Sequence, residues 1–389
     1  MINVLFVASF PMYENLGGVR RVTTTLAKAF KEININVKYF ALQKGEMIIL
    51  GGFENHFLPN SLGLKNEENK TFFKDFLLKN DIHFVINQAG IFPETLNFIK
   101  KDLPQNIKLL SVHHNCISCL QENYKNIIKG GIYGKIGAIL DFPWFWNLLM
   151  TRNKSKYGGY FKNAIAKSDK FILLSESFIP ELKTYISSWP ENKIAAIYNP
   201  APFAIQPEAM HSKENRMLYV GRVEYTQKQC DLLLPIWKAI HQNFPDWHFD
   251  IVGGGSKLQE LIAKAKENDL KNIHFYGFSD PKPFLTKAKV FCMTSSFEGF
   301  PMVLVEAQAY GVVPIAFNSF SSLASIIKDD FTGVIVAPFD LDSYIEKLKQ
   351  LMQDETKCSQ MALQSQVSVK RFMPNTIAQE WLSLFNKNK

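Results

Sequence analysis

Short apolar runs alternate with helical stretches along the whole chain, and this alternation constrains the fold more than any other feature of the sequence. Such runs, separated by helices, are typical of parallel sheets covered by helices on both faces. The sequence therefore predicts an α/β protein with two Rossmann-like units, although no sequence repeat relates the halves. The predicted strands are residues 2–10, 36–42, 82–87, 108–113, 170–175, 217–220, 248–252, 273–276, 290–294, 313–317 and 334–336.

The junction between the two halves is predicted at residues 200–214. Pro200 and Pro202 interrupt any helix or strand there, and a polar run follows them. A chain of 389 residues is long enough for two domains that each bury a core. We predict an N-terminal domain at residues 1–203, a C-terminal domain at residues 204–373 and a last helix at residues 374–389.

Two glutamates, Glu298 and Glu306, flank a predicted strand-to-helix turn. The apolar run before Glu298 suits a buried strand, Pro301 suits the first helical position, and Gly311 ends the helix. Free N–H groups at a helix start bind phosphate, helped by the helix dipole. Each carboxylate accepts hydrogen bonds from a pair of hydroxyls, one pair on a ribose and the other on a sugar. The segment favours a nucleotide-sugar site over two surface charges. Phe300, Met302 and Val303 are also expected to contact the nucleotide sugar.

This segment resembles the Glu-x7-Glu motif of the glycosyl transferases group 1, retaining enzymes with the two-domain GT-B fold that make bacterial surface glycans. The match includes the flanking Glu-Gly-Phe at Glu298 and Glu-Ala at Glu306. The resemblance covers nearly the whole chain. It implies two domains that face each other across a cleft, and a C-terminal helix that crosses back to the N-terminal domain. It also implies a nucleotide sugar as the donor substrate, with UDP as the expected nucleotide, and no cofactor.

Two cations follow the first strand of the second half. Gly221 and Arg222 end that strand, and Lys228 precedes the next helix. Fixed cations stabilise the charge on a leaving diphosphate without a metal. The stretch resembles the family's Gly-Arg…Lys-Gly segment, except that Gln229 replaces the usual glycine and the spacing is about one residue longer. We predict that Arg222 and Lys228, together with Glu298, are catalytic and that Gly221 contacts the nucleotide; ordinary surface charges are the alternative.

The other predicted site residues also follow strands. Gly17 and Gly18 lie between the first strand and the first helix, where paired glycines let N–H groups approach a ligand. The family carries Gly-Gly there, often followed by an acid where this chain has Arg20. His113 matches a histidine that the family places beside the transferred sugar, with a buried structural histidine as the alternative. Gly253 begins a glycine triplet that resembles the family's Val-Gly-x-Gly and is predicted to lie near the nucleotide.

No metal site is predicted. Asp340 and Asp342 imitate a metal-binding D-x-D pattern, but Asp340 is expected to cap the helix that follows it. Cys116 and Cys119 form an isolated C-x-x-C pair, which lacks the second ligand pair of a structural zinc site. The odd number of cysteines, 5, agrees with reduced thiols in a cytoplasmic protein.

The charge balance favours anionic partners. Lysines and arginines outnumber acids by 44 to 36, which gives a net charge of +8. Such an excess suits a diphosphate, a lipid phosphate or a membrane surface. A nucleic-acid partner is not predicted, because no zinc-finger, basic-zipper or RNP signature accompanies the charge. The first residues lack the basic region and cleavage site of a signal peptide, so we expect a cytoplasmic location.

An aromatic stretch within residues 127–161 differs from the rest of the chain. Trp144, Phe145 and Trp146 precede the cations Lys154 and Lys156. Aromatic side chains beside cations are typical of interfacial membrane anchors, and the stretch is too short to span a bilayer. A peripheral contact with the inner face of the cytoplasmic membrane is one hypothesis. Core packing and an acceptor pocket are the alternatives.

The features predict a hexosyltransferase or N-acetylhexosaminyltransferase, and the resemblance implies that it is retaining and metal-independent. It would move a sugar from a UDP-sugar to a hydroxyl of a growing, lipid-linked surface glycan. The sequence has no well-placed enzymic nucleophile, which agrees with a same-face mechanism in which the leaving phosphate assists the acceptor. Two alternatives stay open: a UDP-sugar epimerase of similar fold, and a non-catalytic, membrane-associated binding protein.

Overall fold

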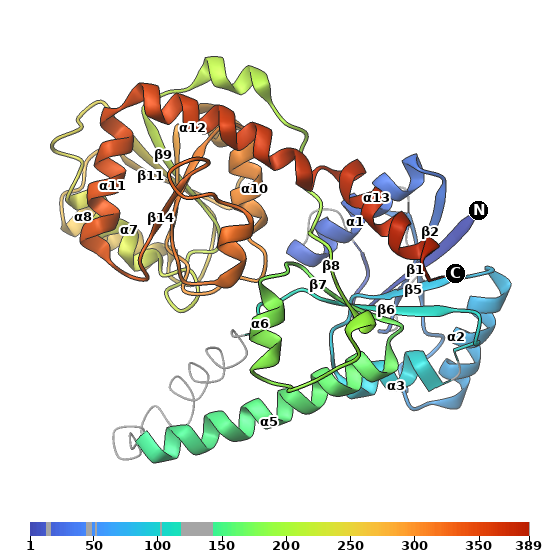
Figure 1. Ribbon diagram of the computed structural model, residues 1–389. Coiled ribbons are helices and arrows are strands. Elements are labelled where there is room, and N and C mark those ends of the chain that lie inside the picture. The colour runs from blue at the N-terminus through green and yellow to red at the C-terminus, as the bar shows by residue number, and fades with distance from the viewer. Residues whose placement is uncertain (13–16, 44–48, 51–52, 102, 118–142, 389) are drawn as a thin grey trace. The chain divides into compact units, whose positions relative to one another are not determined.

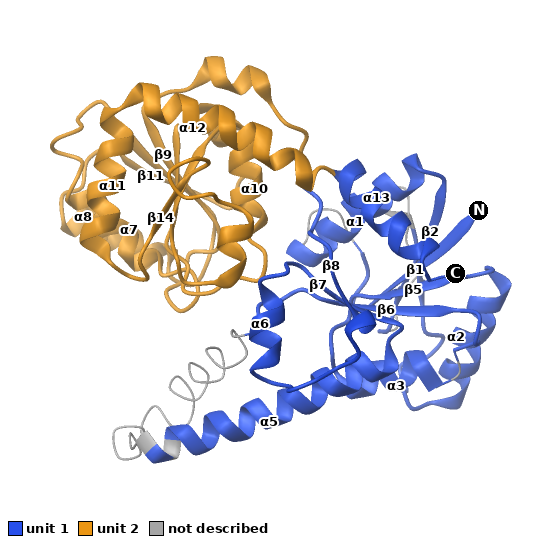
Figure 2. Cartoon of the chain, viewed as in Figure 1, with its two compact units in different colours: residues 1–202, 374–389 blue, residues 203–373 orange. Residues whose placement is uncertain are grey.

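The computed structural model describes residues 1–12, 17–43, 49–50, 53–101, 103–117 and 143–388 (Figure 1). The chain forms two compact units (Figure 2). Unit 1 comprises Met1–Pro202 and Pro374–Lys389, and unit 2 comprises Phe203–Met373, so the division falls one residue before the predicted end of the first domain. Each unit contains one sheet with helices packed around it, and the predicted α/β class is confirmed.

Unit 1 is built on a sheet of eight strands in the order β3-β4-β2-β1-β5-β6-β7-β8, parallel except for the β3–β4 pair. The strands are β1 (Ile2–Ala8), β2 (Ile35–Ala41), β3 (Ile49–Leu50), β4 (Phe53–Phe57), β5 (Phe84–Asn87), β6 (Lys108–His113), β7 (Lys170–Leu173) and β8 (Ile194–Ala196). The helices are α1 (Gly18–Glu32), α2 (Glu67–Lys79), α3 (Pro93–Lys101), α5 (Pro143–Lys167), α6 (Phe178–Lys183) and α13 (Pro374–Asn386).

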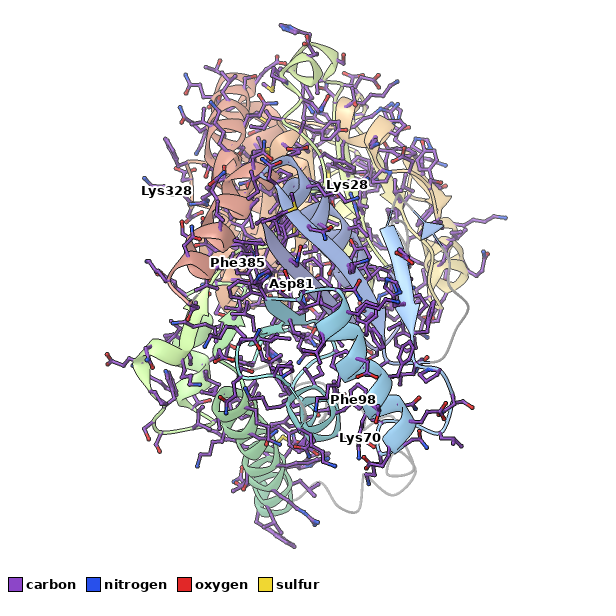
Figure 3. The ribbon with its side chains drawn as sticks, turned by 90° about the vertical axis from the view of Figure 1, so that its right-hand side faces the viewer. Lys28, Lys70, Asp81, Phe98, Lys328 and Phe385 are labelled. Atoms are coloured by element: carbon purple, nitrogen blue, oxygen red, sulfur yellow. The ribbon has the colours of Figure 1, made fainter. Side chains whose placement is uncertain are left out.

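The last helix, α13, belongs to unit 1, as the resemblance implied. Trp381 and Phe385 face α1, where their rings lie 6.2 and 5.7 Å from the ring of Phe30. Phe385 also lies 4.4 Å from the ring of Phe84 on β5. Figure 3 shows Phe385 within the side-chain packing of unit 1, whereas Asp81 is exposed. Aromatic burial of this kind fixes the returning helix on its unit.

Unit 2 is built on a parallel sheet of six strands in the order β11-β10-β9-β12-β13-β14. The strands are β9 (Arg216–Val220), β10 (His248–Val252), β11 (Ile273–Gly277), β12 (Val290–Met293), β13 (Val313–Phe317) and β14 (Val334–Val336). The helices are α7 (Leu233–Lys238), α8 (Leu258–Glu267), α9 (Lys282–Lys287), α10 (Met302–Ala309), α11 (Leu341–Gln353) and α12 (Glu355–Ser368). This strand order is that of a Rossmann unit.

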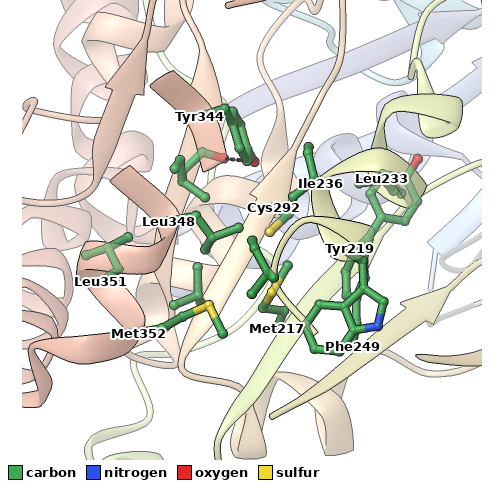
Figure 4. Packing of buried hydrophobic residues seen from close by; sticks show 14 of the residues in the cluster. Met217, Tyr219, Leu233, Ile236, Phe249, Cys292, Tyr344, Leu348, Leu351 and Met352 are labelled. Atoms are coloured by element: carbon green, nitrogen blue, oxygen red, sulfur yellow. Dashed lines mark hydrogen bonds between the residues drawn. The ribbon is translucent and has the colours of Figure 1, made fainter. Parts of the chain in front are cut away.

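The core of unit 2 joins the sheet to the helices on one side (Figure 4). Met217, Phe249 and Cys292 from three neighbouring strands are fully buried beside Leu348 of α11. Polar groups in this packing are satisfied, because the hydroxyl of Tyr344 donates to the carbonyl of Ile315 at 3.0 Å and the indole N–H of Trp237 donates to the carbonyl of Lys271 at 2.7 Å. Parallel strands buried on both faces need such continuous apolar runs, which is why the strands of this unit are visible in the sequence.

Candidate active site

The strand order of unit 2 places several predicted site residues at the carboxyl ends of two neighbouring strands, β9 and β12. β10 lies on one side of β9 and β12 on the other, so the helical crossovers diverge there. In open α/β sheets, ligands bind beside the carboxyl ends of the strands at such a point. The loops that follow β9 and β12 carry Gly221, Arg222, Lys228 and Glu298.

An ion pair joins these two loops. The ammonium Nζ of Lys228 lies 2.5 Å from Oε1 of Glu298, and the two side chains are 16% and 9% exposed. Thr294 donates its hydroxyl to the carbonyl of Lys228 at 2.8 Å, which fixes the β12 loop against the β9 loop. The two loops that carry the pair are therefore fixed to each other, and both side chains are largely shielded from water. An ion pair shielded from water interacts more strongly than one at the surface.

Gln227 connects the pair to Arg222. Its amide nitrogen donates to the carbonyl of Phe297 at 3.2 Å and to Glu298 at 3.4 Å, while its amide oxygen accepts from Arg222 at 3.0 Å. Arg222 itself is exposed. The guanidinium is thus directed by one hydrogen bond but remains in solvent, where a ligand can reach it.

Glu224 shapes the β9 loop and was missed in the sequence. Its carboxylate accepts hydrogen bonds from the backbone N–H groups of Thr226, Gln227 and Lys228 at 2.9 to 3.1 Å. An acidic residue a few positions before a turn is a weak signal, because it is common at protein surfaces. Its role follows only from the folded backbone, which turns three N–H groups toward one side chain.

Sterics explain two positions of the same loop. A Cβ at Gly221 would lie 2.9 Å from the hydroxyl of Tyr219, which donates to the carbonyl of Arg222 at 2.8 Å. The absence of a side chain at Gly221 therefore leaves room for the hydrogen bond between Tyr219 and the backbone of Arg222. Gln229 stands where the family pattern has glycine, and its backbone has φ 46° and ψ 46°. Glycine adopts this left-handed conformation without strain, which explains the glycine in the family pattern.

Helix α10 begins at the carboxyl edge of the sheet, directly after the β12 loop. Pro301 precedes its first residue, Met302, and no side chain caps this end or places an acid in its first turn. Val303 and Met302 are half-buried at the helix start. Ser322 donates to the carbonyl of Gly299 at 2.6 Å and fixes the approach to the helix. These N–H groups and the helix dipole provide an environment suited to an anion.

Glu306 lies one turn into α10 and is only 2% exposed. Phe300, at the end of the β12 loop, is buried against Phe372 with its ring 5.5 Å away. Glu306 is therefore a buried carboxylate on the helix. Glu298 is a buried carboxylate in the turn that precedes the helix, and it pairs with Lys228. Their different surroundings are consistent with different partners.

The glycine triplet after β10 has a packing role. Gly253 has φ +145°, and a Cβ there would lie 1.8 Å from the carbonyl oxygen of Gly221. Gly255 has φ +158°, and its Cβ would lie 2.2 Å from the carbonyl oxygen of Val223. Both glycines let the β10 loop lie directly against the β9 loop. The predicted contact of Gly253 with a nucleotide stays a prediction.

Unit 1 places Gly17 and Gly18 where α1 begins, after the central strand β1. Gly17 has φ 82°, which favours glycine, and a Cβ on either residue would meet no atom of the described residues within 4 Å. Neither an acid nor a side-chain cap occupies the first turn of α1. Space and N–H groups that no side chain of the described residues caps thus occur together at this helix start. The residues just before Gly17 lie outside the described part of the chain.

His113 ends β6 and is buried between aromatic rings. Its imidazole lies 5.2 Å from the ring of Phe161 and 6.2 Å from that of Phe171, and burial lowers its pKa to about 4. Burial, and then the charge of His113, lowers the pKa of His114 to about 3, and His114 contacts Gln88. Both histidines are therefore neutral at pH 7. The role predicted for His113 beside the sugar stays a prediction.

Asp340 caps α11, as expected, because its carboxylate accepts from the N–H of Ser343 at 3.0 Å. Over the described ranges, no group of three or more His, Cys, Asp or Glu side chains could hold a metal ion. The expectation of reduced thiols is wrong at one position: Cys116 is disulfide-bonded, whereas Cys230, Cys292 and Cys358 are free. Cys119 lies outside the described residues.

The aromatic stretch begins helix α5. Trp144 is 66% exposed and Leu148 is 60% exposed, whereas Trp146 is half-buried. Lys154 lies over the ring of Tyr185, 5.8 Å from its centre, so this cation faces its own unit. The side chain of Phe145 lies outside the described residues. Among the helices that the structure describes, none combines the length and apolar character needed to cross a membrane.

Sequence comparison relates the whole chain to sugar transferases. The model of the family "Glycosyl transferases group 1" matches residues 202–366. The chain is 34% identical over 382 residues to the amylovoran biosynthesis glycosyltransferase AmsD of Erwinia amylovora, and the match covers 96% of this chain and 97% of that protein. Several other curated glycosyltransferases match over about half of their own length.

Structural comparison agrees with the sequence comparison. The lipopolysaccharide outer core galactosyltransferase WaaB superposes with a TM-score of 0.70 and 17% identity, covering 100% of both chains. HepE of Anabaena, solved in complex with UDP, superposes with a TM-score of 0.71 and 14% identity, again over 100% of both chains. At this level of identity the likeness shows the fold, which is the GT-B fold.

Proposed function

Because the chain belongs to the glycosyl transferases group 1, we propose that it moves a sugar from a UDP-sugar to a hydroxyl of a growing surface glycan, with retention of configuration. The observation that carries this proposal is the Lys228–Glu298 pair, linked through Gln227 to Arg222 at the carboxyl ends of β9 and β12. The start of α10, which is suited to a diphosphate, follows in the same loop.

In the proposed reaction the leaving group is a diphosphate. The bond between C1 of the sugar and the β-phosphate oxygen breaks, and the acceptor oxygen bonds to C1 on the same face. The acceptor proton passes to the leaving phosphate oxygen. Arg222 and Lys228 offset the negative charge that grows on the phosphate. They take the role that a bound metal ion has in metal-dependent enzymes. Fixed donors of this kind are often the largest single contribution to catalysis.

The two carboxylates would divide the donor between them. Glu298 accepts hydrogen bonds from hydroxyls of the transferred sugar, and Lys228, its present partner, orients the carboxylate. Glu306, buried one turn further, accepts from the ribose. Both assignments rest on the resemblance and on the places of these residues relative to the α10 start.

The comparisons support two finer parts of the proposal, the acceptor class and the nucleotide. AmsD carries amylovoran biosynthesis in its name, and WaaB acts on the lipopolysaccharide outer core, which supports a surface glycan as the acceptor. HepE was solved with UDP, which supports UDP as the nucleotide. We propose further that the acceptor is linked to a lipid and that no metal takes part.

A ligand screen followed by a transfer assay tests this function. UDP and one UDP-sugar should raise the melting temperature more than GDP or ADP in the presence of EDTA, because a ligand that binds only the folded state stabilises it by mass action. Membrane extracts with that labelled UDP-sugar should then yield a labelled glycan with α-retention. Failure of every nucleotide to stabilise the protein would reject the proposal. Conversion of the UDP-sugar without an acceptor would indicate an epimerase, and a manganese requirement would reopen Asp340 and Asp342 as metal ligands.

Replacement of Glu306 by alanine should weaken UDP binding by about 1–3 kcal/mol, because the ribose hydroxyls would lose a charged acceptor. Calorimetric titration with UDP measures this loss. Glu306→Gln keeps the shape of the buried side chain and should lose only the charge-assisted part. Unchanged UDP affinity in Glu306→Ala would remove the ribose from this carboxylate.

The exposed side of α5 suits a lipid surface. Trp144, Leu148, Arg152 and Lys162 are exposed and recur at helical spacing along one side of the helix. Large apolar side chains followed by cations fit the interface and the anionic headgroups of a bilayer. We propose that this stripe, rather than Lys154, holds unit 1 near a lipid-linked acceptor.

The double replacement Trp144→Ser and Leu148→Ser should lower binding to anionic liposomes by about tenfold or more, because each apolar side chain contributes about 1.5–3 kcal/mol when fully buried. Flotation of the protein with vesicles measures it, and wild-type binding should fall with salt. The matched control is Leu62→Ser with Leu78→Ser, two exposed leucines of the same unit. Equal flotation of all three folded proteins would contradict the membrane proposal.

A further inference from the structure

A cavity of about 140 Å³ opens at the edge of the unit 2 sheet opposite to the candidate active site. Lys213 precedes β9 by three residues, and Lys289 directly precedes β12. Cys358 and Ser359 of α12 close the other side. β9 and β12, whose carboxyl ends are followed by Arg222 and Glu298, therefore start at this cavity. The length of these strands separates the cavity from the candidate active site.

The two lysines differ in their partners. Lys289 donates to Asn215 at 2.9 Å and pairs with Glu355 at 2.7 Å. Lys213 donates to the carbonyl of Leu285 at 3.0 Å, and no carboxylate of the described residues pairs with it. An ammonium has three donors, so most of its hydrogen-bonding capacity is not met by protein acceptors. Lys213 is therefore a largely buried amine for which the described residues supply no counter-ion.

We propose that this cavity binds a compact dianion, such as the phosphate group of a phosphomonoester, between Lys213 and Lys289. Its volume is several times the roughly 30 Å³ that one water occupies in the liquid, so a tetrahedral anion fits with some of its hydration. The charge suits it as well, because the pair of Lys289 and Glu355 is neutral overall and Lys213 adds a positive charge.

Binding should be coupled to the uptake of a proton. Burial lowers the pKa of Lys213 to about 7, so part of the empty protein carries a neutral amine there at neutral pH. Of the other groups around the cavity, Cys358 stays a thiol because burial raises its pKa to about 11, and Lys289 lowers the pKa of Glu355, which stays charged. His211 also faces the cavity and is exposed. An anion beside Lys213 favours the charged amine, and affinity should therefore fall as the pH rises.

Sulfate is the probe, because it remains a dianion across the pH range used. Calorimetric titration at constant ionic strength should show the affinity of the wild type falling about tenfold from pH 7.5 to 8.5, as one linked proton requires. Lys213→Met should weaken binding at least about tenfold at pH 6.5 and should remove the pH dependence. Lys271→Met, which removes an exposed lysine elsewhere in unit 2, should bind as wild type. Methyl phosphate in place of sulfate separates a phosphomonoester site from one that admits inorganic ions only.

Two further variants make every outcome decisive. Ser359→Trp places a large side chain at the mouth of the cavity and should abolish sulfate binding with both lysines present, so it decides the matter if Lys213→Met does not fold. Arg222→Ala should bind sulfate as wild type. If Arg222→Ala loses sulfate and Lys213→Met keeps it, the anion occupies the proposed diphosphate site and the second site does not exist. A pH-independent affinity or normal binding by Ser359→Trp would overturn the proposal, whereas UDP binding by these variants tests the proposed function separately.

Discussion

Replacement of Arg222 by alanine will lower kcat by about 100- to 1,000-fold, the usual cost of removing one donor that stabilises a transition-state charge. The free energy of unfolding will change by less than about 0.5 kcal/mol, because the side chain is exposed and its guanidinium makes a single hydrogen bond, to Gln227. Steady-state turnover at saturating donor and urea unfolding measure the two quantities. A large loss of turnover without a loss of stability is expected where a charge matters mainly as the phosphate departs.

Two further variants separate a catalytic arginine from a surface charge. Arg222→Lys should recover turnover only in part, since lysine keeps the charge but lacks the planar fork. Arg371→Ala is the matched control, because Arg371 also donates to a neighbouring acceptor, the carbonyl of Ser325, at 2.8 Å. Turnover of Arg222→Ala close to that of Arg371→Ala would return Arg222 to the surface-charge interpretation.

Most of the strands that the sequence predicted bury both faces, and the edge strand β11 is the most exposed of them. Each predicted run overlaps a strand of the structure, because a continuous apolar run can be recognised without knowledge of the neighbouring strands. The end of β1 shows the limit of such a pattern: the prediction ran to residue 10, whereas the strand ends at Ala8. The apolar residue Phe10 lies beyond Ala8, the last residue that pairs with β2, and the end of this pairing ends the strand.

Three strands of unit 1 were missed for physical reasons, and β3, Ile49–Leu50, has only two residues. β4, Phe53–Phe57, contains the buried Asn55, whose amide exchanges hydrogen bonds with the backbone of Met12 at 2.9 and 3.2 Å. A polar side chain satisfied by a partner 43 residues away breaks the apolar pattern without exposing the strand. β8 has three residues, Ile194–Ala196, which is too short for any periodicity to be visible.

The sequence predicted some residues of the candidate site and missed others. The missed residues depend on partners that are distant in the sequence or on the folded backbone. Glu298 and Arg222 stand out because strand ends and glycines mark their loops in the sequence. Gln227 and Glu224 gain their roles only when the β12 loop and the folded β9 backbone supply their partners. A glutamine that bridges a guanidinium and a carboxylate across 71 positions of sequence has no local signature.

Replacement of Lys228 by methionine will lower kcat by about 100- to 1,000-fold. It will also lower the free energy of unfolding by about 1.5–3 kcal/mol, because Glu298 would lose a charged partner in a place that is largely shielded from water. Turnover and urea unfolding again report the two effects. Unlike Arg222→Ala, this variant changes both quantities, so by itself it cannot separate a catalytic lysine from a structural one.

The double variant Lys228→Met with Glu298→Gln makes that separation. Its neutral side chains remove the unpaired buried charge, so most of the lost stability should return. Turnover should stay at least about 100-fold below wild type, because the cation at the diphosphate and the carboxylate at the sugar are both missing. The control is Arg216→Met with Asp250→Asn, a pair of similar burial at 3.0 Å in the same unit, which should change stability and leave kcat unchanged. If turnover of the Lys228 and Glu298 double variant recovers together with its stability, the ion pair only holds the two loops together, and the charge on the leaving diphosphate must be stabilised by Arg222 and the start of α10 alone.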